Sequence, residues 1–311
     1  MKQLFAILLV GVLGLPAAAA PLSTSARTVI PSAIQQIISV DYRDLRDSQT
    51  AQALRDRVMP DNVKQFENAL RSVGINPDKD AEQLTFVSYR GPKNGLLAIG
   101  IAQGPFNQKD FLSKAKARKI KPAKYQLADI YPMGTGMQMV WLDPSTILFG
   151  ETMALKGALD VRDNGAESLA SNNTINDLIT SIENSATIWS VLDQQGTQNM
   201  VRSALGEAGS ITNFDSVKKR LLASDYLMNF NNGVTFDLNV KTSDTVTAAT
   251  LSGLMQAGVL YKRMSGTPTE KLALENTTVD SSNDVVTMHF KTDDQRFQAL
   301  LKSDLFAAVS R

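Results

Sequence analysis

The 311-residue sequence contains no cysteine and only one histidine, and each absence excludes a class of chemistry. Without cysteine the chain can form no disulfide, no thiolate metal site and no cysteine nucleophile, and it offers no thiol for a lipid anchor. With His289 alone it cannot place two imidazoles on one metal ion, as an H-E-x-x-H zinc site requires. We therefore expect neither a metal ion nor a cofactor.

The chain also lacks a large net charge and, beyond its first residues, a long apolar run. Its 32 basic and 31 acidic side chains leave a formal charge of +1 at pH 7. This balance gives no overall attraction for nucleic acid or acidic membranes, so nucleic acid is not an expected partner. Because charged or small polar residues interrupt the later apolar stretches, no transmembrane segment is predicted after the N-terminal region.

The N-terminus has the pattern of a signal peptide. Lys2 precedes an apolar run over residues 4–15, which is too short to span a bilayer, and four alanines follow at 17–20. Cleavage after Ala19 would place alanine in both small subsites of the peptidase. We predict residues 1–19 to be a signal peptide and the mature protein to be periplasmic or secreted; the alternative is an N-terminal anchor that stays attached.

Hydrophobic periodicity predicts a mixture of strands and helices in the rest of the chain. A strand is expected over 33–42, and apolar residues at helical spacing follow to residue 73, with Pro60 dividing them into two helices. Two strands around a Gly-Pro-Lys-Asn-Gly turn then form a hairpin. The predicted class is α+β, with mainly antiparallel sheets covered by helices.

The second half repeats much of the first. "IISVD" at 37–41 is echoed by "IWSVLD" at 188–193, and both halves read as strand, helices, hairpin, helix, strands and helix. We predict two similar strand-helix-hairpin-helix-strand units, at 28–162 and 186–311, joined by a docked connector at 163–185. The units could form separate domains or share one sheet.

Finer predictions concern single elements. One strand is expected over 124–133, a helix over 214–224 and a strand over 270–280. The strand "STILFGE" (145–151) has no clear counterpart in the second half, which counts against a duplication. The long apolar helix predicted over 244–266 could lie buried within the protein or in the groove of a partner protein, and burial is favoured.

Few residues are candidates for catalysis. Strand alternation places His289 and Lys291 on the more polar side of "VVTMHFKT", which favours a partly solvated strand histidine over a general base. The acids Asp41, Asp44 and Asp47 alternate with arginines, so local neutralisation is favoured over a metal site. Paired carboxylates are defined by their separation in space, so a carboxylate-dependent hydrolase stays as the alternative function.

A dense group of cations is the most distinctive charged feature. It lies in "KDFLSKAKARKIKPAKY" on a predicted helix capped by Asn107, and its members are Lys109, Lys114, Lys116, Arg118, Lys119, Lys121 and Lys124. One interpretation is a binding site for an anionic envelope component or an acidic protein. The other is a solvated helix face. Trp141 and Trp189, both in predicted strands, are expected in the core rather than stacked on a ligand.

The segments "GPFNQKDFLSKA" and "LDPSTILFGE", the second followed by a helix, carry a resemblance to a known group. They resemble exported bacterial proteins of unknown function that are built from tandem α+β units. The resemblance implies a fold and no activity. We therefore expect an exported, soluble, non-enzymatic protein that binds a component of the cell envelope or exterior.

Overall fold

The structure is a computed structural model that describes residues 21–58, 61–91, 95–133, 136–205, 214–231 and 233–300. The predicted signal peptide and the end of the last predicted helix, residues 301–311, lie outside the described residues.

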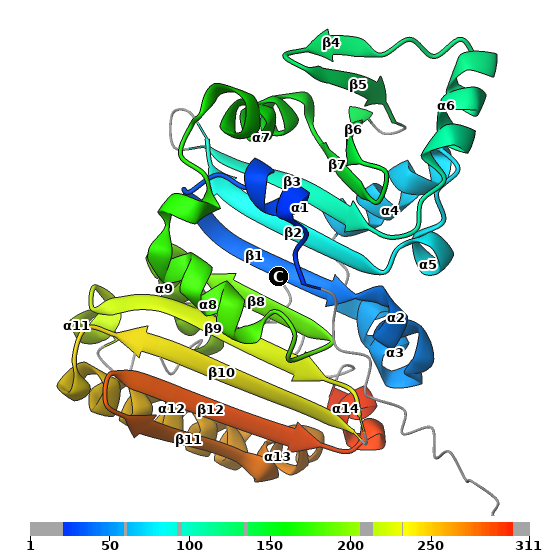
Figure 1. Cartoon of the computed structure of the whole chain (residues 1–311). Helices are drawn as coiled ribbons and strands as arrows, with labels where there is room; N and C mark the ends of the chain where they lie inside the picture. The colour runs from blue at the N-terminus through cyan, green and yellow to red at the C-terminus, as the bar shows by residue number, and fades with distance from the viewer. Residues whose placement is uncertain are drawn as a thin grey trace, which may run out of the picture.

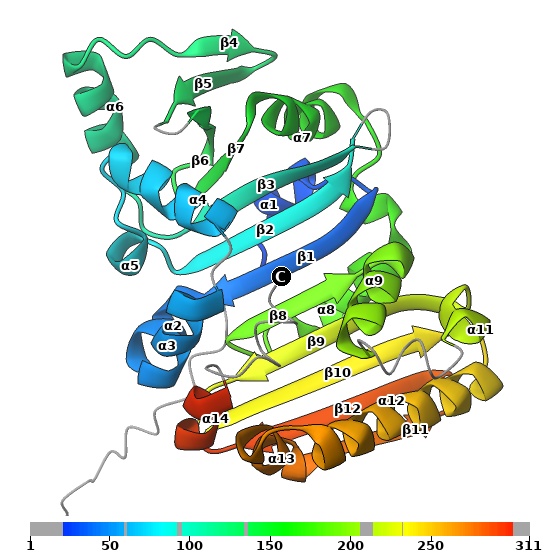
Figure 2. The same ribbon diagram turned by 180° about the vertical axis from the view of Figure 1, so that it is seen from behind.

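The strands form one large antiparallel sheet, as Figures 1 and 2 show from its two sides. The order across it is β11-β12-β10-β9-β8-β1-β2-β3-β7-β6-β5-β4. The strands are β1 Ile34–Asp41, β2 Gln83–Arg90, β3 Leu96–Gln103, β4 Ala123–Tyr125, β5 Ala128–Pro132, β6 Gln138–Asp143, β7 Thr146–Gly150, β8 Ile188–Leu192, β9 Leu221–Asn229, β10 Val234–Thr242, β11 Thr277–Ser282 and β12 Val285–Thr292. The predicted α+β class, with a large antiparallel sheet flanked by helices, is confirmed.

Helices cover both faces of the sheet. They are α1 Thr24–Val29, α2 Tyr42–Asp47, α3 Gln49–Val58, α4 Asp61–Ser72, α5 Pro77–Asp80, α6 Gln108–Ala117, α7 Thr152–Asn164, α8 Asn173–Ile182, α9 Gln194–Leu205, α11 Asp215–Lys218, α12 Thr245–Ser265, α13 Pro268–Ala273 and α14 Asp294–Leu300. One core, on the face toward the viewer in Figure 1, joins β1, β2, β3 and β8 to α1, α7 and α8. Two cores lie behind it, one beneath α2, α3, α4 and α6 and one beneath α9 and α12.

The two halves of the chain meet at the centre of this sheet. Strand β8 pairs antiparallel with β1 over Gln36–Val40, and Trp189 of β8 is 1% exposed between Ser39 of β1 and Leu227 of β9. The order runs β1, β2, β3, β7, β6 on one side and β8, β9, β10, β12, β11 on the other. The halves therefore share one sheet rather than forming two separate ones.

This order corrects the prediction about the extra strand. Strand β7, which contains most of "STILFGE", lies next to β3 as β12 lies next to β10. The element without a counterpart in the order is instead the β4–β5 hairpin. Residues 124–133, predicted as one strand, turn back at Gln126, whose φ is 50°.

Two other predicted elements are wrong in part. The helix expected over 214–224 ends at Lys218, because Leu221 and Ala223 enter β9 with their side chains buried in the sheet. The strand expected over 270–280 begins only at Thr277, after α13 and a 3-10 turn. Two helices are found where they are predicted, with α3 ending at Val58 and α4 beginning at Asp61; Pro60 itself lies outside the described residues.

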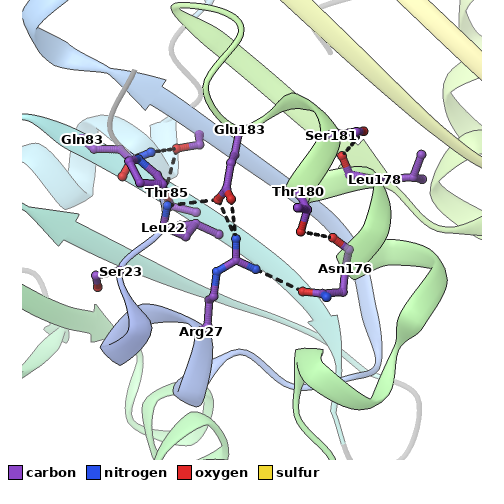
Figure 3. A network of polar contacts seen from close by, with 12 residues as sticks. Leu22, Ser23, Arg27, Gln83, Thr85, Asn176, Leu178, Thr180, Ser181 and Glu183 are labelled. Carbon is purple, nitrogen blue, oxygen red and sulfur yellow. Dashed lines mark hydrogen bonds and ion pairs between the residues drawn. The ribbon is translucent and has the colours of Figure 1, made fainter. Parts of the chain in front are cut away.

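The first described residues form a clip that ties the N-terminus to α8 (Figure 3). Ser23 caps α1, and Leu22 is buried on the sheet. The Arg27 guanidinium donates to both carboxylate oxygens of Glu183 at 2.7 and 2.6 Å and to Asn176 Oδ1 at 3.0 Å, and the Leu22 amide donates to Glu183. Residues 21–27, which carried no sequence prediction, thus join the first described segment to the connector, where α8 buries Ile175, Ile179 and Ile182.

Candidate functional site

The predicted cations gather on α6 and on the segment that leads from it into β4. This part of the chain projects beyond β3 and β7 at the top of Figure 1. All seven residues, which we call the basic cluster, are exposed: Lys109, Lys114, Lys116, Arg118, Lys119, Lys121 and Lys124. The structure therefore places the whole predicted set on one accessible part of the molecule.

Helix α6 is held from beneath by aromatic contacts. Asn107 accepts a hydrogen bond from the Asp110 amide at 3.0 Å, as its predicted cap role requires. The Phe111 ring contacts Tyr131 and Trp141 with centroid separations of 5.2 and 5.7 Å. Trp141 lies at the base of this helix and is only half-buried, which departs from the expected core position. Trp189 lies in the core as expected. The cations are presented on a helix whose position is fixed by packing.

Helix α6 packs on the sheet through a narrow stripe. Phe111 and Ala115 are buried, whereas Leu112 is 38% exposed. Successive residues on a helix differ by about 100° in direction, and a helix that packs through a narrow stripe leaves the next position outside it. The outer surface of α6 is therefore cationic with one apolar side chain.

Most of the basic cluster has no carboxylate beside it. Lys114 pairs with Asp110 at 2.7 Å and Lys124 with Asp129 at 2.6 Å. The other five make no salt bridge with any of the described residues. An exposed cation without a partner keeps its charge available to a ligand, and several together raise the local potential.

The hollow beside α6 is too small for an organic ligand. It lies between the end of α4, α6 and β5, holds about 20 Å³, and has Lys114 and Arg118 among its lining residues. That volume admits one or two water molecules. The basic cluster can therefore recognise an anion across its surface but cannot enclose one.

A second polar surface lies on the face of the second half that α12 does not cover. Figure 1 shows β9, β10, β12 and β11 toward the viewer, with α12 behind them. Strand register aligns Asp225, Asn239 and Thr287, and Asn239 donates to the Asp225 carboxylate at 2.9 Å while Thr287 donates to Asn239 at 3.2 Å. The sequence alone does not predict this ladder, because only the strand register brings its three residues together.

The only histidine lies on the same face. His289 Nδ1 is hydrogen-bonded to Asp237 Oδ1 on the neighbouring strand, and the two side chains are 44% and 36% exposed. This is the partly solvated strand histidine that the alternation predicts.

Asp225 is the buried acid of this surface, at 5% exposure, and its burial gives a testable pH effect. Burial raises the pKa of Asp225, and the hydrogen bond from Asn239 opposes the rise. A raised pKa in the folded state means that the charged form costs stability above that pKa and that the cost disappears below the unfolded value. We expect Asp225→Asn to raise the melting temperature at pH 7.

The same variant should lose this advantage in acid. As the pH falls through the raised pKa toward the ordinary value of 3.8, the wild-type carboxyl becomes neutral and the melting temperatures should converge. Differential scanning calorimetry from pH 7 to about pH 4 measures the gap. Asp237→Asn, on the exposed pair, is the control, and an equal gap at all pH values would contradict the assignment to burial of Asp225.

Asp41 and Asp44 of "DYRDLRD" each have hydrogen-bond partners in the structure. Asp41 accepts from the Arg43 and Asp44 amides at the start of α2 and pairs with the Arg43 guanidinium at 2.9 Å. Burial, followed by the nearby Asp41 charge, raises the pKa of Asp44, and Thr187 donates a hydrogen bond to it. The local neutralisation predicted from the interleaved arginines is therefore found at Asp41, whereas Arg46 donates to the backbone carbonyls of Asp78 and Lys79. No group of three or more acidic or histidine side chains within the described ranges could hold a metal ion.

The comparisons with known proteins concern the fold. A structure of TP0453, a bacterial protein, in crystal form I has a TM-score of 0.52 at 10% identity and covers 95% of this chain and 100% of its own. Crystal form III of TP0453 gives a TM-score of 0.47 over 92% of this chain and 99% of its own, also at 10% identity. No family model and no curated protein matches. The likeness at this identity shows a shared fold and carries no function.

None of the helices in the part of the chain that the structure describes has both the length and the apolar character needed to cross a bilayer.

Proposed function

We propose that the protein is exported to the periplasm or the exterior, and that it is a non-enzymatic protein that binds polymeric anions of the cell envelope or its surroundings through the basic cluster. The observation that carries the proposal is the group of five exposed cations on α6 and its exit segment that make no salt bridge within the described residues. The signal-peptide pattern of residues 1–19 supports the compartment.

The shape of the site supports a polymer as the ligand. A small anion gains affinity when a pocket surrounds it with donors, and the hollow beside α6 holds only about 20 Å³. A polymeric anion instead contacts several surface cations at once. Lysine ammonium groups act as mobile point charges that match a repeating anion without fixed geometry, and six of the seven cations are lysines.

We also propose that residues 28–162 and 186–311 are copies of one unit. The equal strand order on the two sides of the β1–β8 junction supports this proposal. The β4–β5 hairpin is then an addition to the first copy. Of the basic cluster, Lys124 lies in this added hairpin, whereas Lys109, Lys114 and Lys116 lie on α6, the helix that follows the first hairpin as α12 follows the second.

Charge reversal tests the function. The variant Lys116→Glu, Arg118→Glu, Lys119→Glu should fold as the wild type, because all three side chains are exposed. We expect it to pass through a heparin column at about 0.01 M salt, where the Debye length is about 30 Å, while the wild type is retained. The reason is that the reversed side chains repel the anionic column, which the cations of the wild type attract.

The matched control carries the same change of net charge in the second half, as Lys241→Glu, Lys271→Glu, Lys291→Glu, at three exposed and separated positions. It should be retained nearly as well as the wild type. Equal loss in both variants would mean that net charge alone causes retention, and unchanged retention of the first variant would remove the basic cluster from the proposal.

A further inference from the structure

The outer face of α12 exposes large apolar side chains, beside Thr250 and Gln256, where a surface helix is normally charged or polar. Its inner face packs on the sheet through Ala248, Leu251 and Met255. On the opposite side, four large side chains are exposed by between 41% and 72% of their surface: Val246, Leu260, Tyr261 and Met264. Helix α8, by contrast, buries isoleucines and exposes Asp177, Thr180 and Ser181. The amphipathic pattern expected of a helix on a sheet is absent from α12.

Small residues complete this face. Ala249, Gly253 and Ala257 follow at intervals of four, on the same side of the helix as Val246, Leu260 and Met264. Nothing lies within 4 Å of the point where a Cβ on Gly253 would stand, whereas Gly258 has Leu205 at 3.4 Å. The intrachain contacts of the described residues therefore do not require a glycine at 253, although glycine disfavours a helix. A close approach from outside would explain it.

No charge interrupts this face, which we call the α12 stripe. The two charged residues of the helix lie off it, and both are half-buried. The Arg263 guanidinium donates to the backbone carbonyls of Leu274, Glu275 and Thr277 of its own chain. A helix that lies on an anionic bilayer carries cations along the flanks of its apolar face. The α12 stripe lacks them, which favours a protein helix as the occupant.

We propose that the α12 stripe binds the α12 stripe of a second copy of this chain, antiparallel and about a two-fold axis at Gly253. This surface is separate from the basic cluster, so the inference is independent of the proposed function. Side-chain sizes are symmetric about Gly253. In this arrangement Ala249 lies opposite Ala257 of the second copy, and Val246 lies opposite Leu260 of the second copy. Small residues meet at the centre, where helices cross most closely, and large ones meet at the ends.

Helix orientation and exposed area agree with this occupant. Antiparallel helix dipoles are favourable. The exposed apolar side chains, with Leu272 of α13, offer on the order of 500 Å² per copy, or about 1,000 Å² in total, which is at the low end of specific interfaces. The dimer should therefore have a Kd in the micromolar range.

Sedimentation equilibrium of the mature chain from about 1 to about 100 µM tests the proposal. We expect the mass to rise from monomer toward dimer across this range. Gly253→Glu should weaken association at least tenfold, since it places a charge on the axis, while glutamate is the better helix former and keeps the fold intact. Thr180→Glu, on the outer face of α8, should leave the dimer unchanged.

Cysteine cross-linking tests the register, because the natural chain has no cysteine and any disulfide must join two copies. Gly253→Cys should form a covalent dimer under mild oxidation, and a mixture of Ala249→Cys with Ala257→Cys should form the mixed dimer in preference to either homodimer. The yield of cross-linked dimer from Thr180→Cys, on the outer face of α8, gives the background level. A monomer at every concentration, cross-linking at the background level, or a monomer that binds phosphatidylglycerol vesicles through the stripe would each overturn the proposal.

Discussion

Trp189→Ala should destabilise the protein by about 4 kcal/mol, the largest effect that we expect from a single substitution. The side chain is 1% exposed in the strand that joins the two halves, and it packs with Ile37, Val87 and Val191 in the core beneath α1, α7 and α8. Removing it leaves a cavity at the junction of β1 and β8, where surrounding strands cannot collapse without breaking register. Urea denaturation followed by far-ultraviolet circular dichroism measures the loss.

Two variants serve as controls for Trp189. Trp189→Phe keeps most of the ring volume and removes an indole N–H that has no hydrogen-bond partner among the described residues, so it should cost less than about 1.5 kcal/mol. Trp141→Ala removes the same side chain from a half-buried position and should cost about half as much as Trp189→Ala. Equal losses of stability at the two tryptophans would contradict the claim that packing at the β1–β8 junction contributes more to stability than packing at the base of α6.

Arg27→Met should cost about 2 to 3 kcal/mol, the second largest effect. The substitution leaves the Glu183 carboxylate, whose side chain is 9% exposed, with the Leu22 amide as its only other donor in the described residues. An uncompensated buried carboxylate is expensive, although the 28% exposure of Arg27 moderates the loss. The N-terminal clip should also open, which limited proteolysis followed by mass spectrometry would detect as early cleavage near residue 27.

The control for the clip is Arg296→Met. Arg296 pairs with Asp293 on the surface, with side-chain exposures of 40% and 56%, and exposed pairs of this kind contribute less than about 1 kcal/mol. It should leave both stability and the proteolysis pattern near those of the wild type. If Arg27→Met behaved like Arg296→Met, the N-terminal segment would be a passive extension rather than a clip.

The sequence predicted the elements whose signals are local. One helix ends at Val58 and the next begins at Asp61, as the sequence around Pro60 predicts, and alternation places His289 on a polar strand face, each because the decisive residues lie within a few positions of one another. The basic cluster is also a local feature, and the structure keeps it together on one accessible part of the molecule.

The failures have a common physical cause, which is pairing between strands distant in sequence. Residues 221–224 suit a helix by composition, but β9 takes them because β8 and β10 lie on either side. The Gln126 turn has no glycine or proline to mark it. The ladder of Asp225, Asn239 and Thr287 draws one residue from each of three strands, so only the register brings the three together.

The α12 helix shows a different limit. Its sequence is apolar on all sides, and such a helix is usually buried. The structure buries only the side that faces β10, β11 and β12, because no described element lies over the other side. Sequence periodicity can show that a second apolar face exists, but it does not distinguish a neighbour within the chain from one outside it.

The most direct test of the central claim is the affinity for a fluorescently labelled sulfated oligosaccharide, measured by anisotropy at about 0.01 M and about 0.15 M salt. If each cation near a polyanion contributes about 1 kcal/mol, loss of Lys116, Arg118 and Lys119 alone weakens binding about a hundredfold, so their reversal should weaken it by at least that factor at low salt. The control with three reversed lysines in the second half should stay within about threefold of the wild type, and wild-type affinity should fall with salt. Wild-type affinity in the reversed variant, or equal loss in the control, would contradict the claim.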